Sequence, residues 1–369
     1  MNTFSRRQFL KSLGAVATLV LTNQTSFSLA QNSGNFEMLV VGDSLIWGQG
    51  LEEKDKIYTL TKDWLQTELG KNVNLKVKAH SGATIFLPDN EAKLLQKGEI
   101  AETRTFYPEV NLSFPTLKAQ IENAQNEYQT PENVNLVLLT GGIGGITGAG
   151  VLNPFGNNKI LQNDIKKYCN EEMFHFLEYS ANVFPNALFT VIGYFPILSQ
   201  KSDTAKTFNS FLTLYAIPRP LKPLVNNILT RQFFKPIKNK ALKRSRIWFE
   251  DSNRELNTAV NRLNEKFGKR RAVFVKSPLT EANAFENRET QLFKVEKNNK
   301  VNDDFYDERR TECKKILSDL KKTIGLKQSV RQCEIAAVGH INQVGARAYF
   351  ETIKEKLKPI LQIEKQKMF

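Results

Sequence analysis

Five short apolar segments recur along this chain, and their spacing constrains its fold more than any other feature. They occupy residues 36–41 (FEMLVV), 73–79 (VNLKVKA), 134–140 (VNLVLLT), 187–195 (ALFTVIGYF) and 271–276 (RAVFVK). Near-continuous apolar strands separated by helix-length intervals are typical of a parallel sheet that helices cover on both faces. The sequence therefore predicts an α/β fold, a three-layer α/β/α sandwich with a mainly parallel five-stranded sheet.

The intervals between these segments carry helical periodicity. Helices are predicted at residues 56–69, 114–125, 163–184, 253–267 and 343–361. No internal repeat or low-complexity linker divides the chain, so we predict a single domain at 31–369 with one main insertion around 200–250. Ligands of such sheets bind outside the carboxyl ends of the strands, which directs attention to the residues after the first strand.

The insertion combines aromatic residues, prolines and seven basic residues from Arg231 to Arg246. It is either a lid or interfacial segment that lies on an anionic lipid surface, or a solvated basic helix beside the core. The formal net charge of +14 favours anionic partners without identifying one. No recognised nucleic-acid-binding module accompanies the basic run, so we do not predict nucleic-acid binding.

The first thirty residues have the pattern of an export signal. Arg6 and Arg7 precede Phe9 and Leu10, an apolar stretch follows, and small residues around Ala30 suit cleavage. This arrangement resembles a twin-arginine signal, and the apolar stretch is short for a membrane span of about 20 residues. We therefore predict an exported protein that is periplasmic, extracellular or associated with the cell envelope; the alternative is an uncleaved N-terminal anchor.

Export changes the interpretation of the three cysteines, because disulfides persist outside the cytosol. Cys313 and Cys333 lie on either side of a lysine-rich segment, and Cys169 lies far from both. We hypothesise a Cys313–Cys333 bridge, which would brace the approach to His340, although spacing leaves the connectivity open. No Cys-x-x-Cys or His-Glu-x-x-His spacing occurs, so neither a metal site nor a cofactor is predicted.

Ser44 lies in a Gly-Asp-Ser-Leu turn directly after the first strand, within VVGDSLIWGQGL at 40–51. A serine hydroxyl becomes a good nucleophile only when a base removes its proton, and the chain offers three histidines. His175 lies in a helical run and is expected to be a partly buried helix residue, while His80 ends the second strand and could border a site. His340 opens a loop before the last helix, and we choose it as the base. The alternative is a plain turn in which Ser44 caps the following helix.

Four sequence blocks occur in an informative order. They are VVGDSLIWGQGL at 40–51, HSGAT at 80–84, TGGIGGI at 140–146 and GHINQVGARAYF at 339–350. Together they resemble the SGNH, or GDSL, hydrolase family over nearly the whole mature chain. The resemblance implies a flavodoxin-like sheet and hydrolysis of carboxylic esters without a metal.

The resemblance also implies roles for individual residues. Ser44 would be the nucleophile, with its backbone N–H as one oxyanion donor, and His340 would be the base. Gly82, in HSGAT, would supply a second donor through its main chain, where the missing Cβ permits close approach to a substrate.

The third block departs from the family. The family usually places an asparagine there, followed by aspartate, whereas Gly144 and Gly145 align with that pair. Three alternatives remain: a backbone N–H of Gly144 or Gly145 replaces the side chain, Asn153 reaches in, or the oxyanion hole has one donor fewer.

The fourth block also departs, because Ala337 occupies the position of the aspartate that usually lies three residues before the histidine. His340 would then be oriented by a backbone carbonyl or by another acid such as Glu334. A similar alanine-containing block, together with LNP after the third block and cysteines flanking the last loop, is found in a subgroup of SGNH-like bacterial proteins. The chain resembles that subgroup.

Two functions follow as hypotheses. The first is an exported serine esterase, lipase-like, that forms an acyl-enzyme on a small-molecule, lipid or glycan ester and contacts an anionic membrane surface peripherally. The second is a catalytically weak or inactive SGNH-like protein that binds a lipid, glycan or envelope polymer in the cleft. The missing side chain in the third block favours the second.

Overall fold

The computed structural model describes residues 34–98, 110–203, 206–207, 228–296, 300–324 and 328–367, and the predicted export signal lies outside them. Five strands form one sheet in which every neighbouring pair is parallel. They are β1 (Phe36–Val41), β2 (Val73–Val77), β3 (Val134–Leu139), β4 (Leu188–Ile192) and β5 (Ala272–Val275), in the order β2-β1-β3-β4-β5. The predicted five-stranded parallel sheet is confirmed, and its strand order is the flavodoxin-like one.

Burial explains why the apolar segments form this sheet. Every residue of β3 and β4 is buried, and β1 is buried except at Glu37. β2 lies at the edge and is fully buried only at Val73. Central strands covered on both faces have no solvated side, which accounts for continuous apolar runs rather than alternation.

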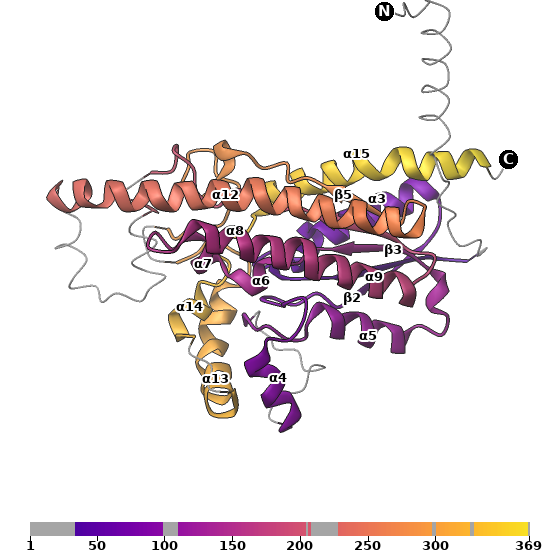
Figure 1. Cartoon of the computed structure of the whole chain (residues 1–369), viewed down its shortest axis with the longest axis horizontal. Helices are drawn as coiled ribbons and strands as arrows, with labels where there is room; N and C mark the ends of the chain where they lie inside the picture. The colour runs from indigo at the N-terminus through magenta and orange to yellow at the C-terminus, as the bar shows by residue number, and fades with distance from the viewer. Residues whose placement is uncertain are drawn as a thin grey trace, which may run out of the picture.

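Helices cover both faces of the sheet, as predicted for a three-layer α/β/α fold. α3 (Ile57–Leu69) and α15 (Gln343–Lys367) pack against each other on one face. The other layer contains α5 (Leu117–Glu127), α8 (Asn158–Lys166), α9 (Met173–Val183) and α12 (Ile228–Phe267). α8 and α9 follow each other end to end, and in Figure 1 this rod lies between α5 and α12. The chain moves one way along the sheet from β1 to β2 and the other way from β2 to β5. Right-handed crossovers, the general rule for parallel strands, place the helices of these two directions on opposite faces.

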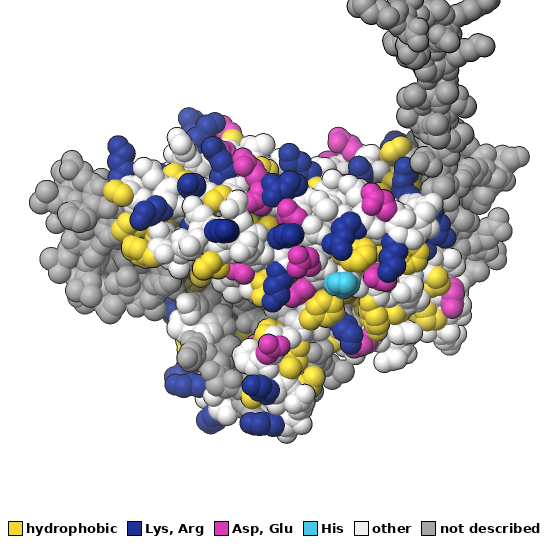
Figure 2. All heavy atoms as spheres, in the orientation of Figure 1, with side chains coloured by type: hydrophobic (Ala, Val, Ile, Leu, Met, Phe, Trp, Pro, Cys, Tyr) yellow, Lys and Arg dark blue, Asp and Glu magenta, His cyan; other side chains and the backbone are white. Residues whose placement is uncertain are grey.

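The basic run at 231–246 lies in α12, a single helix of 40 residues, whereas residues 204–205 and 208–227 of the insertion lie outside the described residues. The predicted helix at 253–267 is only its C-terminal part. Arg244 donates to the carbonyls of Val151 and Gly150, and Arg246 pairs with Glu281. Figure 2 shows Lys and Arg interspersed with Asp and Glu over this face. The basic helix is thus partly engaged in the fold, and its contact with lipid stays a prediction.

Three helices not expected from the sequence surround a second, smaller apolar core. They are α4 (Asp89–Gln96), α13 (Tyr306–Ile324) and α14 (Val330–Glu334), and α4 and α13 project from the same edge of the molecule in Figure 1. The buried residues of this core are Val110, Leu112, Phe114, Cys313, Leu317, Leu320 and Cys333. We refer to α4, residues 110–114, α13 and α14 together as the cap.

The remaining short elements connect these layers. They are α2 (Ser44–Trp47), η1 (Glu53–Asp55), η2 (Pro131–Asn133), α6 (Ile143–Ile146), α7 (Gly148–Leu152), the π-helical η3 (Lys167–Glu172) and η5 (Glu281–Asn283). Among the helices that the structure describes, none has the length and apolarity needed to cross a bilayer.

Candidate active site

Ser44 lies on a tight turn directly after β1. Gly42 adopts a φ of 141°, and α2 begins two residues later at Ser44. A Cβ atom at Gly42 would lie 2.6 Å from the carbonyl oxygen of Thr140, so only glycine fits between the ends of β1 and β3. The turn leaves Ser44 partly exposed at the carboxyl ends of β1 and β3. The chain leaves these two strands in opposite directions along the sheet, and ligands of such sheets bind at this point.

The buried carboxyl group of Asp43 holds this turn in place. Its Oδ1 accepts hydrogen bonds from the Leu45 N–H at 3.1 Å and the Thr140 hydroxyl at 2.8 Å. Its Oδ2 accepts a hydrogen bond from the Tyr194 hydroxyl. Burial raises the pKa of Asp43, while the hydrogen bonds from Tyr194 and Thr140 act in the opposite direction. The sequence did not predict a role for Asp43 or Tyr194, although an aspartate at the N-cap position of a helix can be recognised from the local sequence.

The loop between α14 and α15 brings His340 to the same place. The Nε2 atom of His340 lies 2.8 Å from the Oγ atom of Ser44, although 296 positions separate them in the sequence. Backbone hydrogen bonds fix the loop, since the Gly339 N–H donates to Phe293 at 2.9 Å and the Phe293 N–H donates to His340 at 2.8 Å. The structure therefore joins Ser44 and His340 by a hydrogen bond.

The other ring nitrogen of His340 has a different environment. Nδ1 is buried, and among the described residues no hydrogen bond of normal length and angle reaches it, although the backbone of Ala337 and Ala336 interacts with the ring. The carboxylate of Glu334, considered as an orienting acid, pairs with Arg331 at 3.0 Å instead. Burial lowers the pKa of His340 to about 4, and the backbone of Ala337 and Ala336 opposes that shift only in part. The imidazole is consequently neutral at neutral pH, as a base must be.

The remaining two histidines take no direct part in this pair. His80 is buried, and its Nδ1 lies 2.9 Å from the carbonyl oxygen of Ser81. His175 is exposed on α9, so the expectation that it is partly buried was wrong. It lies on the outer side of a helix whose buried face includes Met173 and Phe176.

Gly82 and Ser44 are the two residues predicted to offer backbone N–H groups to an oxyanion. Gly82 has a φ of 82°, a conformation that favours glycine, and both residues line one cavity with His340. Within the described ranges, neither N–H donates to another group of the fold. Neither N–H is therefore committed to a hydrogen bond within the described residues.

The two other residues considered for the oxyanion differ in position. Gly144 lines the cavity, but a Cβ atom there would lie 2.4 Å from the carbonyl oxygen of Ala83, so the site has no room for a side chain. Asn153 is exposed at the end of α7, and its Oδ1 accepts the Phe155 N–H at 3.0 Å. It does not line the cavity, because this local turn uses its side chain.

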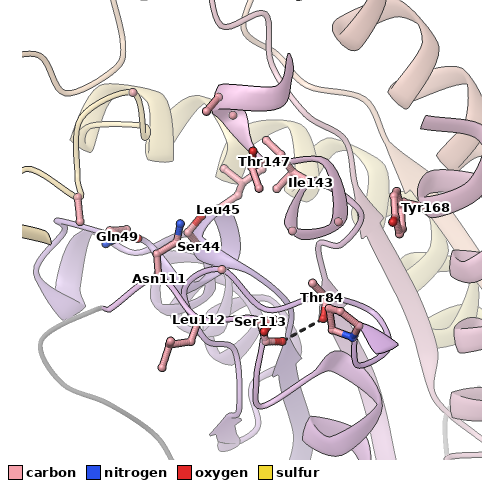
Figure 3. A pocket seen from close by; sticks show the side chains of 18 of the residues that line it. Ser44, Leu45, Gln49, Thr84, Asn111, Leu112, Ser113, Ile143, Thr147 and Tyr168 are labelled. Atoms are coloured by element: carbon pink, nitrogen blue, oxygen red, sulfur yellow. Dashed lines mark hydrogen bonds between the residues drawn. The ribbon is translucent and has the colours of Figure 1, made fainter. Parts of the chain in front are cut away.

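The cavity around Ser44 has a volume of about 1290 Å³. Its wall mixes apolar and polar side chains from the main core and the cap. Figure 3 shows the apolar residues Leu45, Leu112 and Ile143 on it with Ser44. Polar groups gather on part of the wall, where the Thr84 hydroxyl donates to the carbonyl of Ser113. Such a cavity can hold a large apolar group beside the Ser44 hydroxyl.

Cys313 and Cys333 form a disulfide that joins α13 to α14. The loop from α14 to His340 begins directly after Cys333 and Glu334, so the bridge lies close in sequence to the predicted base. Cys169 is buried and unpaired. In the described ranges, no group of three or more His, Cys, Asp or Glu residues is arranged to hold a metal ion.

No protein-family model and no curated protein sequence matches the chain. Solved structures with a similar arrangement include phospholipase A1 from Streptomyces albidoflavus, at 11% identity and a TM-score of 0.43 over 88% of this chain and 100% of that one. An extracellular lipase from Streptomyces rimosus is similar at 11% identity and a TM-score of 0.43, covering 87% of this chain and 99% of that one. A family 3 carbohydrate esterase from Clostridium thermocellum has 13% identity and a TM-score of 0.38, covering 89% and 98%. Similarity at this level assigns no function to this chain.

Proposed function

We propose that this chain hydrolyses carboxylic esters, with Ser44 as nucleophile and His340 as general base. The observation that carries the proposal is the 2.8 Å hydrogen bond between Ser44 Oγ and His340 Nε2. A neutral imidazole with its proton on Nδ1 leaves the Nε2 lone pair free to accept the serine proton. The low pKa of His340 supports this state at neutral pH.

The reaction follows from these two groups. Ser44 Oγ bonds to the ester carbonyl carbon while its proton passes to His340 Nε2, and the carbonyl π electrons move to the oxygen. When the oxyanion collapses, the bond to the alcohol oxygen breaks and His340 returns the proton to the leaving alcohol. Water then attacks the acyl carbon while its proton passes to His340 Nε2. When this second oxyanion collapses, the bond to Ser44 Oγ breaks, His340 returns the proton to Ser44 Oγ, and the carboxylic acid is released.

The negative oxygen formed in each step needs fixed donors. The Ser44 and Gly82 N–H groups, both unengaged within the described fold, support this role. Each well-aimed donor contributes about 3 kcal/mol to stabilising the transition state.

The cavity supports an ester with a bulky apolar acyl group. Its volume of about 1290 Å³ exceeds what a short acyl chain needs, and apolar side chains such as Leu45, Leu112 and Ile143 line part of it. We propose lipidic esters as the substrate class. The N-terminal sequence supports export to the periplasm, cell envelope or exterior, where such esters occur in membranes.

A second function is supported by the third sequence block. Gly144 has no room for a side chain, so the donor that the SGNH family usually supplies there is missing. A protein with weak or no catalysis would still bind a lipid, a glycan or an envelope polymer in the same cavity.

Ester hydrolysis by the mature chain separates these two functions. We expect turnover of p-nitrophenyl esters from acetyl to palmitoyl, and loss of about 10⁴-fold or more in kcat for Ser44→Ala and His340→Ala. Ser318→Ala and His175→Ala, at exposed positions on α13 and α9, serve as matched controls and should keep full activity. A fluorophosphonate should label the wild type and not Ser44→Ala. Equal turnover by wild type and both site variants contradicts the enzyme and favours the binding protein.

We also propose a peripheral contact between α12 and an anionic membrane. Lys235, Lys240 and Lys243 are exposed on this helix and supply the charge that supports it. Changing all three to Gln should weaken sedimentation with phosphatidylglycerol vesicles, most strongly at low salt, whereas phosphatidylcholine vesicles should show no difference. Unchanged binding at low salt contradicts the contact.

A further inference from the structure

The oxyanion of the proposed reaction has two backbone donors and no side-chain donor from the third block. Ile143, which opens α6 on the cavity wall, is apolar, and its N–H donates to the Tyr194 hydroxyl at 3.3 Å. Gly144 is packed against the Ala83 carbonyl. The third block therefore offers at most the backbone N–H groups of Gly144 and Gly145, which line the cavity, and a side-chain donor has to come from another segment.

Asn111 lies directly beside Gly82. A Cβ atom built on Gly82 would lie only 2.2 Å from Oδ1 of Asn111, and 2.7 Å from the backbone nitrogen of Leu112. The same cavity is lined by Asn111, Ser44 and His340, and Figure 3 shows Asn111 and Ser44 on one wall of it. The asparagine side chain therefore borders the place where the oxyanion forms.

The backbone around Asn111 is fixed to the turn that carries Gly82. The Leu112 N–H donates to the carbonyl of Ser81 at 3.1 Å, and the Thr84 N–H donates to the carbonyl of Ser113 at 2.9 Å. Val110 and Leu112, the neighbours of Asn111, are both buried in the cap, whereas Asn111 itself is exposed. The alternation aims the Asn111 side chain out of the cap core and toward the cavity.

The amide of Asn111 is also available. In the part of the chain that the structure describes, no hydrogen bond engages this side chain. Its Oδ1 faces Gly82, so the amide NH₂ group lies on the other side of the planar group and has two protons to donate.

We propose that Asn111 is a catalytic residue that donates an N–H of its side chain to the oxyanion, as a third donor beside Ser44 and Gly82. This inference rests on the proposed ester hydrolysis. The polar side chain in the oxyanion hole then comes from the cap, where Asn111 alternates with buried residues, and not from the third sequence block.

Kinetics of Asn111 variants test the proposal. Asn111→Ala should lower kcat about 100-fold on p-nitrophenyl butyrate with little change in KM, because the donor acts in the transition state. Asn111→Asp, which keeps the shape but replaces the donor with a negative carboxylate, should lower kcat further. Asn153→Ala is the matched control at an exposed asparagine outside the cavity and should retain the wild-type kcat.

Binding of octylboronic acid gives a second readout that needs no turnover. Its tetrahedral adduct with Ser44 places a negative oxygen in the hole, so its affinity should fall about 100-fold in Asn111→Ala, while the affinity for 1-octanol should not change. An active Asn111→Ala variant with kcat within twofold of wild type overturns the role of Asn111 and leaves the hydrolase intact. A wild type that neither turns over esters nor forms the boronate adduct overturns both. A rise in KM alone makes Asn111 a substrate-binding residue and also overturns the proposal.

Discussion

Asp303 and Arg309 form an ion pair in which both side chains are completely buried, with 2.5 Å between Asp303 Oδ2 and Arg309 Nη2. The Arg309 Nε–H also donates to the carbonyl of Glu334, the last residue of α14, at 3.2 Å. Asp304, which follows Asp303 in the sequence, accepts hydrogen bonds from the Glu52 N–H at 3.1 Å and from the Gln343 side-chain N–H at 3.2 Å. Asp303, Asp304 and Arg309 therefore connect the loop after α2 to both ends of the loop that carries His340.

The buried pair leads to a prediction on stability. Arg309→Met leaves the Asp303 carboxylate buried without its cation and should lower the free energy of unfolding by about 3–5 kcal/mol. Chemical denaturation measures this change. The exposed pair of Lys300 and Asp307, 3.5 Å apart, is the control, and Asp307→Asn should change stability by about 1 kcal/mol or less. Equal effects of the two variants would contradict the importance of the buried pair.

The environment of His340 leads to a prediction on pH. Burial lowers its pKa to about 4, so the neutral base persists well below the usual histidine range. The value of kcat/KM should rise tenfold per pH unit below about 4 and become flat above about pH 5. The same shift makes the folded state bind the proton less readily than the unfolded state, so the contribution of His340 to stability falls as pH drops from about 6.5 toward 4. Stopped assays with circular dichroism at each pH separate the two effects, and a kinetic midpoint near 6.5 would refute the assignment.

Gly144 is predicted to tolerate no side chain. In Gly144→Ala the new Cβ would lie 2.4 Å from the Ala83 carbonyl, so the turn that carries Gly82 has to shift. We expect a loss of about 1–3 kcal/mol in stability and a lower kcat. Gly148→Ala, where the new Cβ meets open space, should keep both properties. Thermal unfolding and ester kinetics check the pair, and a fully active, stable Gly144→Ala protein would contradict the packing described here.

Tyr194 is predicted to hold the nucleophile turn through Asp43. Tyr194→Phe removes the hydroxyl that donates to Asp43 and accepts the Ile143 N–H, leaving a buried carboxylate oxygen without this donor. Stability should fall by about 1–3 kcal/mol, and kcat should fall with it. Tyr179→Phe, which removes a partly buried hydrogen bond to Glu122 away from the site, is the control and should leave kcat unchanged. An unaltered kcat in Tyr194→Phe would mean that the turn holds Ser44 without this bond.

The disulfide is predicted to stabilise the cap. Reduction of Cys313–Cys333, which closes a loop with a sequence separation of 20, should lower stability by about 3 kcal/mol. The rate of hydrolysis of long-chain esters should fall more than the rate for acetate esters, because the cap lines the cavity. The Cys313→Ser/Cys333→Ser double variant should show the same losses and should not respond to reductant. If reductant impairs that variant equally, the bridge is not the cause.

The sequence could predict features that depend on local patterns. Apolar runs such as 134–140 identified the strands, because a buried parallel strand has no solvated side. The turn at Ser44 was visible from its residues and its position after a strand. The helical periodicity at 253–267 located a helix but not its start, because the basic residues from 231 to 246 concealed a continuous helix that begins at Ile228.

Only the tertiary structure decided which distant groups meet. Glu334 is close to His340 in sequence but pairs with Arg331, and Asn153 follows the third block but its side chain serves a local turn. Asn111 belongs to no sequence block, yet it touches Gly82 because backbone hydrogen bonds join their two loops. Periodicity reports burial along one segment, whereas contacts between segments depend on how the sheet, its helices and the cap pack together. The sequence thus determined the fold class and the candidate pair of Ser44 and His340, and packing decided what surrounds that pair.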